Sequence, residues 1–138
     1  MEGDEEPLTT KDHLLLTRAE AFLRQQHAQL RILFKLGARG SALVWLDQER
    51  NDTPLKRIKV PACKFSDHEG LSLVDTTGAG DTFTAAYAVN MAQQRKREEA
   101  PVDEAAAMRY ASVSAFLCIT RFGALPSLPT WQEVSKLL

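Results

Sequence analysis

One short segment of the chain combines glycines and carboxylates at a spacing that can do chemistry: Asp75-Thr76-Thr77-Gly78-Ala79-Gly80-Asp81. Glycines let the backbone turn sharply, and exposed N–H groups at the start of a helix bind anions. A carboxylate at Asp81 would repel a bound phosphate, so its place beside such a site needs a chemical reason. Accepting the proton of an attacking hydroxyl is one, because phosphoryl transfer needs an oriented nucleophile beside a charge-stabilising pocket.

The same residues allow other interpretations. Gly78-Ala79-Gly80 can form an ordinary strand-to-helix turn that Asp81 caps, and on these residues alone this alternative is as good as the functional one. A dinucleotide-binding fingerprint would need a glycine where Phe83 stands. A Walker-type phosphate loop needs Gly-Lys followed by Ser or Thr, which the sequence does not contain. Two familiar nucleotide motifs are therefore excluded.

The segments around this motif predict a layered α/β domain. A capping box at Thr17-Arg18-Ala19-Glu20 predicts the start of a helix, after a loose segment over residues 1–16. Apolar runs predict four strands, of which the first two form a hairpin around Gly37–Gly40: 31–36, 41–46, 55–60 and 71–74. Three further helices are expected over 82–94, 103–120 and, after a capping box at Thr130, 131–138.

Composition and charge exclude several classes of protein. The chain has 138 residues, 44% of them hydrophobic, and a formal net charge of -1, so neither nucleic acid nor a membrane is expected as a partner. Cys63 and Cys118 form no Cys-x-x-Cys pair, which argues against a disulfide scaffold or a zinc site and favours a reducing, cytoplasmic setting. The acidic N-terminus is the opposite of a signal peptide.

Three segments together resemble the ribokinase-like (PfkB) carbohydrate kinases, and ribokinases most of all. Residues 75–83 look like the family's C-terminal signature, and Leu36-Gly37-Ala38-Arg39-Gly40 resembles its nucleotide loop. Residues 120–129 resemble its closing segment. The resemblance covers residues 17–138 as the C-terminal part of a kinase domain. It implies a three-layer α/β/α, Rossmann-like fold, of which this chain holds the C-terminal half only.

The resemblance also implies roles for individual residues. Asp81 would be the general base for a primary hydroxyl of a sugar, with ribose as the leading substrate, and the backbone N–H groups of Gly78–Asp81 would form the anion hole. ATP, Mg²⁺ and K⁺ are the implied cofactors. The implied ATP-binding residues are Lys35, Gly37, Gly40 and Ser112, the K⁺ ligands are Asp75, Thr77, Cys118, Gly123 and Ser127, and Glu2 would serve Mg²⁺. A small polar residue on a buried helix is an equally good interpretation of Ser112, and loop capping is an alternative for Asp75.

Two departures from the family pattern leave a second function open. Lys35 stands where the family often has Thr, so it either reaches a phosphate as a point charge or marks a disused nucleotide site. Family members are longer, and the part that precedes this chain supplies most sugar contacts. We therefore expect a homo-oligomer or a missing N-terminal half as partner, and exposed apolar surface around 31–36 and 105–119. The alternative function is a catalytically inactive kinase-like fragment that acts as a binding or scaffold module.

Overall fold

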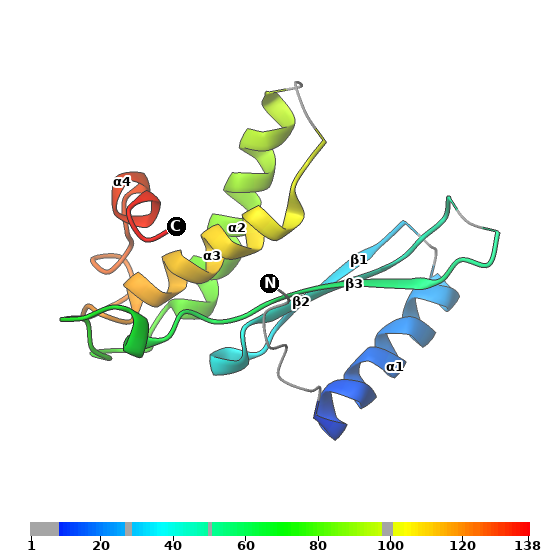
Figure 1. Ribbon diagram of the computed structural model, residues 1–138, viewed down its shortest axis with the longest axis horizontal. Coiled ribbons are helices and arrows are strands. Elements are labelled where there is room, and N and C mark those ends of the chain that lie inside the picture. Colours follow the sequence, from blue (N-terminus) through cyan, green and yellow to red (C-terminus); the bar gives the residue numbers. More distant parts are fainter. Residues whose placement is uncertain (1–8, 27–28, 50, 98–100) are drawn as a thin grey trace. The chain divides into compact units, whose positions relative to one another are not determined.

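The computed structural model of the chain describes residues 9–26, 29–49, 51–97 and 101–138. The helices and strands, in chain order, are α1 (Thr10–Gln26), β1 (Arg31–Lys35), β2 (Ser41–Leu46), β3 (Leu55–Val60), α2 (Ala79–Lys96), α3 (Glu104–Cys118) and α4 (Trp131–Ser135) (Figure 1). Short 3-10 turns cover Gly37–Arg39 and Phe65–Asp67. The chain divides into two compact units: unit 1 has residues 1–34 and 43–58, and unit 2 has residues 35–42 and 59–138.

The three strands form one sheet in the order β1-β2-β3, which confirms the first three predicted strands and the predicted hairpin between the first two. The prediction of a strand at 71–74 is wrong. The N–H groups of Val74 and Asp75 both donate to the carbonyl of Ile119, at 2.9 and 3.2 Å, and no ladder forms. A strand needs a neighbouring strand to pair with, and the described part of the chain places none beside this segment.

In unit 1, α1 packs against the sheet through Ala19 and Leu23, which share a buried cluster with Val44 and Leu46. The helix begins seven positions before the predicted N-cap at Thr17, whose hydroxyl instead donates to the His13 carbonyl at 3.0 Å within the helix. The prediction of a loose segment is therefore wrong for residues 10–16.

A different capping box starts α1. The N–H and hydroxyl of Thr9 donate to the Asp12 carboxylate at 3.0 and 2.8 Å, and the Asp12 N–H donates to the Thr9 hydroxyl at 3.2 Å. This reciprocal pair satisfies N–H groups that a helix start otherwise leaves without an acceptor. Phe22 of α1 is 48% exposed and so lies off the packed face of the helix.

In unit 2, α2 and α3 lie side by side, and α4 contacts α3 through a cluster that joins Tyr110, Val113 and Leu117 to Val134. The Asp103 side chain caps α3 by accepting from the Ala106 N–H at 2.8 Å. The prediction of exposed apolar surface on this helix is wrong, because most of its apolar side chains are buried. Large exposed apolar side chains in unit 2 lie instead at Leu73, Val74, Val89, Phe122, Leu125, Leu128, Trp131 and Leu138.

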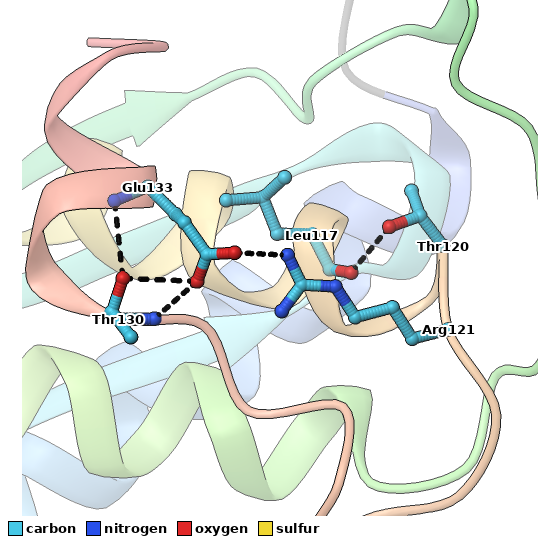
Figure 2. A network of polar contacts seen from close by, with 5 residues as sticks. All are labelled: Leu117, Thr120, Arg121, Thr130 and Glu133. Carbon is cyan, nitrogen blue, oxygen red and sulfur yellow. Dashed lines mark hydrogen bonds and ion pairs between the residues drawn. The ribbon is translucent and has the colours of Figure 1, made fainter.

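The predicted capping box at Thr130 is confirmed, and it extends to Arg121 (Figure 2). One Glu133 carboxylate oxygen accepts from the Thr130 N–H at 2.7 Å, and the other accepts from the Arg121 guanidinium at 2.5 Å. These hydrogen bonds, the Thr130 N–H first, lower the pKa of Glu133 to about 2. α4 ends at Ser135, before the predicted Leu138, and α3 ends at Cys118, two residues before the predicted end at Thr120.

Among the described residues, no helix combines the length and the apolar character that crossing a lipid bilayer requires.

Candidate active site

The glycine-rich turn at the start of α2 has the backbone geometry that the sequence predicts. Gly78 is the N-cap and has φ 79°, in the left-handed region that favours glycine. A Cβ atom at Gly78 would lie 3.1 Å from the Cβ of Ala124. The Thr82 N–H donates to the Gly78 carbonyl at 2.8 Å, so the helix is fully formed one turn later. The chain thus turns sharply into α2.

The first turn of α2 presents backbone donors next to a carboxylate. The N–H groups of Gly80 and Asp81 lie where a helix offers no internal acceptor, and the helix dipole adds partial positive charge there. The Asp81 side chain is exposed on the same turn. The Ala79 N–H, expected to face the anion as well, instead donates to the Thr76 carbonyl at 3.3 Å.

Lys35 brings a full positive charge to this turn. Its Nζ atom lies 3.0 Å from the Gly80 carbonyl oxygen and 3.0 Å from the Thr84 hydroxyl, which itself donates to the Gly80 carbonyl. The Lys35 side chain is exposed, so its ammonium can exchange one of these acceptors for a bound anion. The sequence placed Lys35 at the nucleotide phosphates, and the structure places it beside the predicted anion hole.

Two of the predicted ATP-binding residues meet at one short segment after β3. A Cβ atom at Gly40, which has φ 88°, would lie 2.0 Å from the Val60 carbonyl oxygen, so the loop packs directly on this backbone. The Ser112 hydroxyl donates to the Pro61 carbonyl at 3.4 Å. Gly37 lies on the open side of the loop, where a Cβ atom would meet nothing within 4 Å.

The predicted cation ligands are linked through Asp75. One oxygen of its carboxylate accepts from the Thr77 N–H at 2.9 Å, and the other accepts from the Gly123 N–H at 2.9 Å. Hydrogen bonds from the Thr77 side chain, and then from the backbone N–H groups of Thr77 and Gly123, lower the pKa of Asp75. The carboxylate therefore fastens the closing segment to the start of the glycine-rich turn.

Cys118 and Ser127 complete the linkage. The Cys118 sulfur lies 3.1 Å from the Ser127 hydroxyl oxygen and 3.7 Å from the Thr77 carbonyl oxygen, and both side chains are fully buried. The five predicted ligands are thus brought together, and their donors are a carboxylate, carbonyls and a hydroxyl. Such hard oxygen donors fit K⁺. Glu2, the residue implied for Mg²⁺, lies outside the described residues.

Sequence reasoning missed two threonines of the site, Thr82 and Thr84. Thr82 donates to the Cys118 sulfur at 3.4 Å, and Thr84 contacts Lys35. Both threonines lie within three positions of the end of the Gly-Ala-Gly-Asp motif, and this closeness is the signal that could have identified them. The described residues contain no cluster of three or more His, Cys, Asp or Glu side chains suited to a metal ion. A hollow of about 400 Å³ in unit 1, lined by residues 29–31 and 45–49, includes none of the predicted site residues.

Comparison with known proteins connects this geometry to a family. The family model described as pfkB family carbohydrate kinase matches residues 5–131. The ribokinase of Arabidopsis thaliana is 40% identical over 107 residues, which make up 78% of this chain and 23% of that protein. Fructokinase-1 of Oryza sativa subsp. japonica is 40% identical over 72 residues, which make up 47% of this chain and 20% of that protein.

The solved structure of Arabidopsis thaliana ribokinase in complex with ribose and ATP confirms the predicted ribokinase-like α/β fold. It matches with a TM-score of 0.67 and 33% identity over 94% of this chain and 34% of that one. The chain thus spans about a fifth of the length of these curated relatives and a third of the solved structure. Because the family model covers nearly all of the chain, the chain belongs to the pfkB family of carbohydrate kinases.

Proposed function

We propose that this chain forms the phosphoryl-transfer part of an ATP-dependent sugar kinase in which Asp81 is the general base. The observation that carries the proposal is the first turn of α2. There the exposed Asp81 carboxylate lies on the same turn as the Gly80 and Asp81 N–H groups, which have no acceptor within the helix. A base beside a site for negative charge is what transfer of a phosphoryl group to a hydroxyl requires.

The residues of this turn have different proposed roles in phosphoryl transfer. Asp81 takes the proton of the sugar's primary hydroxyl as the hydroxyl attacks. The N–H groups of Gly80 and Asp81, together with the dipole of α2, stabilise the charge on the phosphoryl group as it moves. The Gly78 N–H is the third proposed donor of the anion hole, while Ala79 contributes by shaping the turn through its hydrogen bond to Thr76.

The nucleotide is proposed to bind beside this turn. The loop that holds Gly37 and Gly40 takes the phosphates of ATP, and Ser112, which shares the 60–62 segment with Gly40, lies toward the adenosine. Lys35 adds positive charge between this loop and α2. Ribose is the leading substrate because the Arabidopsis relative, whose match covers most of this chain, is a ribokinase.

Two metal ions belong to the proposal. K⁺ bound by Asp75, Ser127 and the carbonyls of Thr77, Cys118 and Gly123 would supply a fixed charge that holds the loop in place. The support is the convergence of these residues through the Asp75 and Cys118 hydrogen bonds. Mg²⁺ accompanies ATP in phosphoryl transfer, and Glu2 is the candidate from this chain for organising it.

The deciding experiment is ribose-dependent release of ADP from ATP by Asp81→Asn, in the presence of Mg²⁺ and K⁺. We expect turnover at least about 10²-fold below that of the unmodified protein, with ATP binding retained, because the variant loses a proton acceptor. Asp67→Asn is the matched control, since Asp67 is an exposed carboxylate in the 3-10 turn after β3. Near-normal turnover in Asp81→Asn would show that Asp81 is not the general base.

A second candidate is a kinase-like fragment that binds partners without turnover. The observation that favours it is the short span of the chain, about a fifth of the curated relatives. The same assay separates the two functions when the chain is tested alone and after addition of an N-terminal half from a related kinase. Turnover in either sample that Asp81→Asn abolishes supports the kinase, and ATP binding without turnover in both supports the binding module.

A further inference from the structure

The side chain of Cys118 is buried at the last position of α3, where three segments of unit 2 meet. Its sulfur accepts from the Thr82 hydroxyl, 3.4 Å away on the first turn of α2. It lies 3.1 Å from the hydroxyl oxygen of Ser127 in the closing segment and 3.7 Å from the Thr77 carbonyl oxygen in the glycine-rich turn. One atom therefore touches all three segments that form the proposed site, and its exposed fraction is 0%.

The hydrogens available to these groups fix the direction of each hydrogen bond. Ser127 has one hydroxyl hydrogen, and it donates that hydrogen to the Ala124 carbonyl at 2.6 Å. The contact between Cys118 and Ser127 then needs the thiol hydrogen as donor. The thiol has one hydrogen, and donating it to Ser127 at 3.1 Å takes it from the longer, 3.7 Å contact with the Thr77 carbonyl oxygen. The Thr77 carbonyl oxygen then keeps its lone pairs, and the Ser127 oxygen retains one.

We propose that the Cys118 thiol is a positioning residue for the K⁺ site. It aims the free lone pair of Ser127, leaves the Thr77 carbonyl open to the cation, and couples both to the first turn of α2 through Thr82. This role belongs to the side chain and is separate from that of the Cys118 carbonyl. It rests on the proposed function, because the cation site is part of that proposal.

The test is the effect of K⁺ on thermal unfolding of the chain, measured against Na⁺ and choline at constant ionic strength. We expect K⁺ to stabilise the unmodified chain more than Na⁺ does. Cys118→Ala should raise the half-saturating K⁺ concentration about three- to tenfold, the usual effect of one lost hydrogen bond. Cys118→Ser keeps a donor and an acceptor and should stay closer to the unmodified chain. Cys63→Ala is the matched control, because Cys63 is a free cysteine that packs against the Tyr110 and Val113 cluster instead.

Each outcome supports or overturns a specific statement. The melting temperature in choline reports any loss of packing, so a change confined to the K⁺ midpoint separates positioning from stability. An unchanged K⁺ midpoint in Cys118→Ala overturns the role of the thiol and leaves the cation site standing. An unmodified chain without a K⁺-selective response overturns the cation site and this inference together, while Asp81 is still judged by turnover. If Cys118→Ala does not fold, Cys118→Val fills the volume without a donor, and a Val variant that matches the Ser variant contradicts the proposal.

Discussion

The Nζ atom of Lys35 lies 3.0 Å from the carbonyl oxygen of Gly80. The contact joins the last residue of β1 to the first turn of α2 within unit 2, across 45 positions of the sequence. A Cβ atom at Gly80 would lie 3.4 Å from the same Nζ atom, so the glycine leaves the ammonium room to approach the helix backbone. The relationship places an exposed positive charge on the same helical turn as the N–H groups that are proposed to hold a phosphoryl group.

Lys35→Met should weaken ATP binding roughly fivefold, because the variant keeps the length of the side chain and loses its charge next to the phosphates. Titration calorimetry with a non-hydrolysable ATP analogue measures the change. Lys35→Arg is the charge-conserving control and should bind ATP more tightly than the Met variant does. Equal affinity in all three proteins would leave Lys35 with only its structural contact to Gly80 and Thr84.

The two glycines of the nucleotide loop should differ strongly in how well they tolerate alanine. At Gly40 the added Cβ atom would lie 2.0 Å from the Val60 carbonyl oxygen, and φ is 88°. Both the overlap and the strained backbone oppose folding, so Gly40→Ala should lower the free energy of unfolding by about 3 kcal/mol or more. At Gly37 only the φ of 63° opposes the substitution, so Gly37→Ala should cost about 1 kcal/mol.

Urea denaturation of the two variants and the unmodified chain tests this difference. A Gly40→Ala variant as stable as Gly37→Ala would contradict the packing of the loop on the segment after β3. Comparing Gly40→Ala with Gly37→Ala also separates the effect of the loop on folding from its effect on ATP binding. A loss of ATP affinity in the stable Gly37→Ala variant would come from the phosphate site alone.

The sequence predicted local structure best where one motif of neighbouring residues had no competing motif beside it. The capping box at Thr130, the turn at Gly78 and the strands at 41–46 and 55–60 each depend on residues that are neighbours in the chain, and the structure has all of them. At the N-terminus two capping boxes competed. The structure uses Thr9 with Asp12. A helix that starts there still packs Ala19 and Leu23 against the sheet and is two turns longer at its N-terminal end.

Contacts between residues far apart in the chain could not be predicted from the sequence. An apolar run at 71–74 has the composition of a strand, but pairing depends on a neighbour that no local pattern specifies. The family resemblance named Cys118 only for its carbonyl, since the partners of its sulfur lie 9 positions ahead at Ser127 and 36 positions back at Thr82. The contact between Lys35 and α2 spans a still longer distance in the sequence and was not predicted from it.

The hydrogen bonds of Glu133 should make part of the stability depend on pH. Its pKa is about 2, against an ordinary value of 4.5, so the folded state binds this proton less tightly than the unfolded state does. The contribution is complete above pH 4.5 and is lost as the pH falls from 4.5 toward 2. Glu133→Gln should lower the melting temperature at pH 7 and flatten its decline between pH 4.5 and 3.

Thermal melts of Glu133→Gln and the unmodified chain across this pH range give the measurement. Glu104→Gln is the control, because Glu104 lies in the first turn of α3 and Leu117, which Figure 2 labels in the Arg121 network, lies at the other end of that helix. Parallel pH profiles for Glu133→Gln and the unmodified chain would show that the Thr130 and Arg121 hydrogen bonds do not hold the carboxylate in its charged form.

Turnover of the active protein should rise with K⁺ and respond weakly to Na⁺, and Asp75→Asn should abolish this selectivity. The asparagine removes the negative charge and leaves one oxygen where the carboxylate has two, so it cannot accept from both Thr77 and Gly123. Ribose-dependent ADP release as a function of each cation, at constant ionic strength, measures the effect. Asp67→Asn should keep the K⁺ response, since the Asp67 carboxylate accepts from the Ser66 hydroxyl and is not among the proposed cation ligands. If turnover is indifferent to the cation in the unmodified protein, Asp75 acts only as the hydrogen-bonding link between the glycine-rich turn and the closing segment, and the lowered pKa of its carboxyl reflects that structural role.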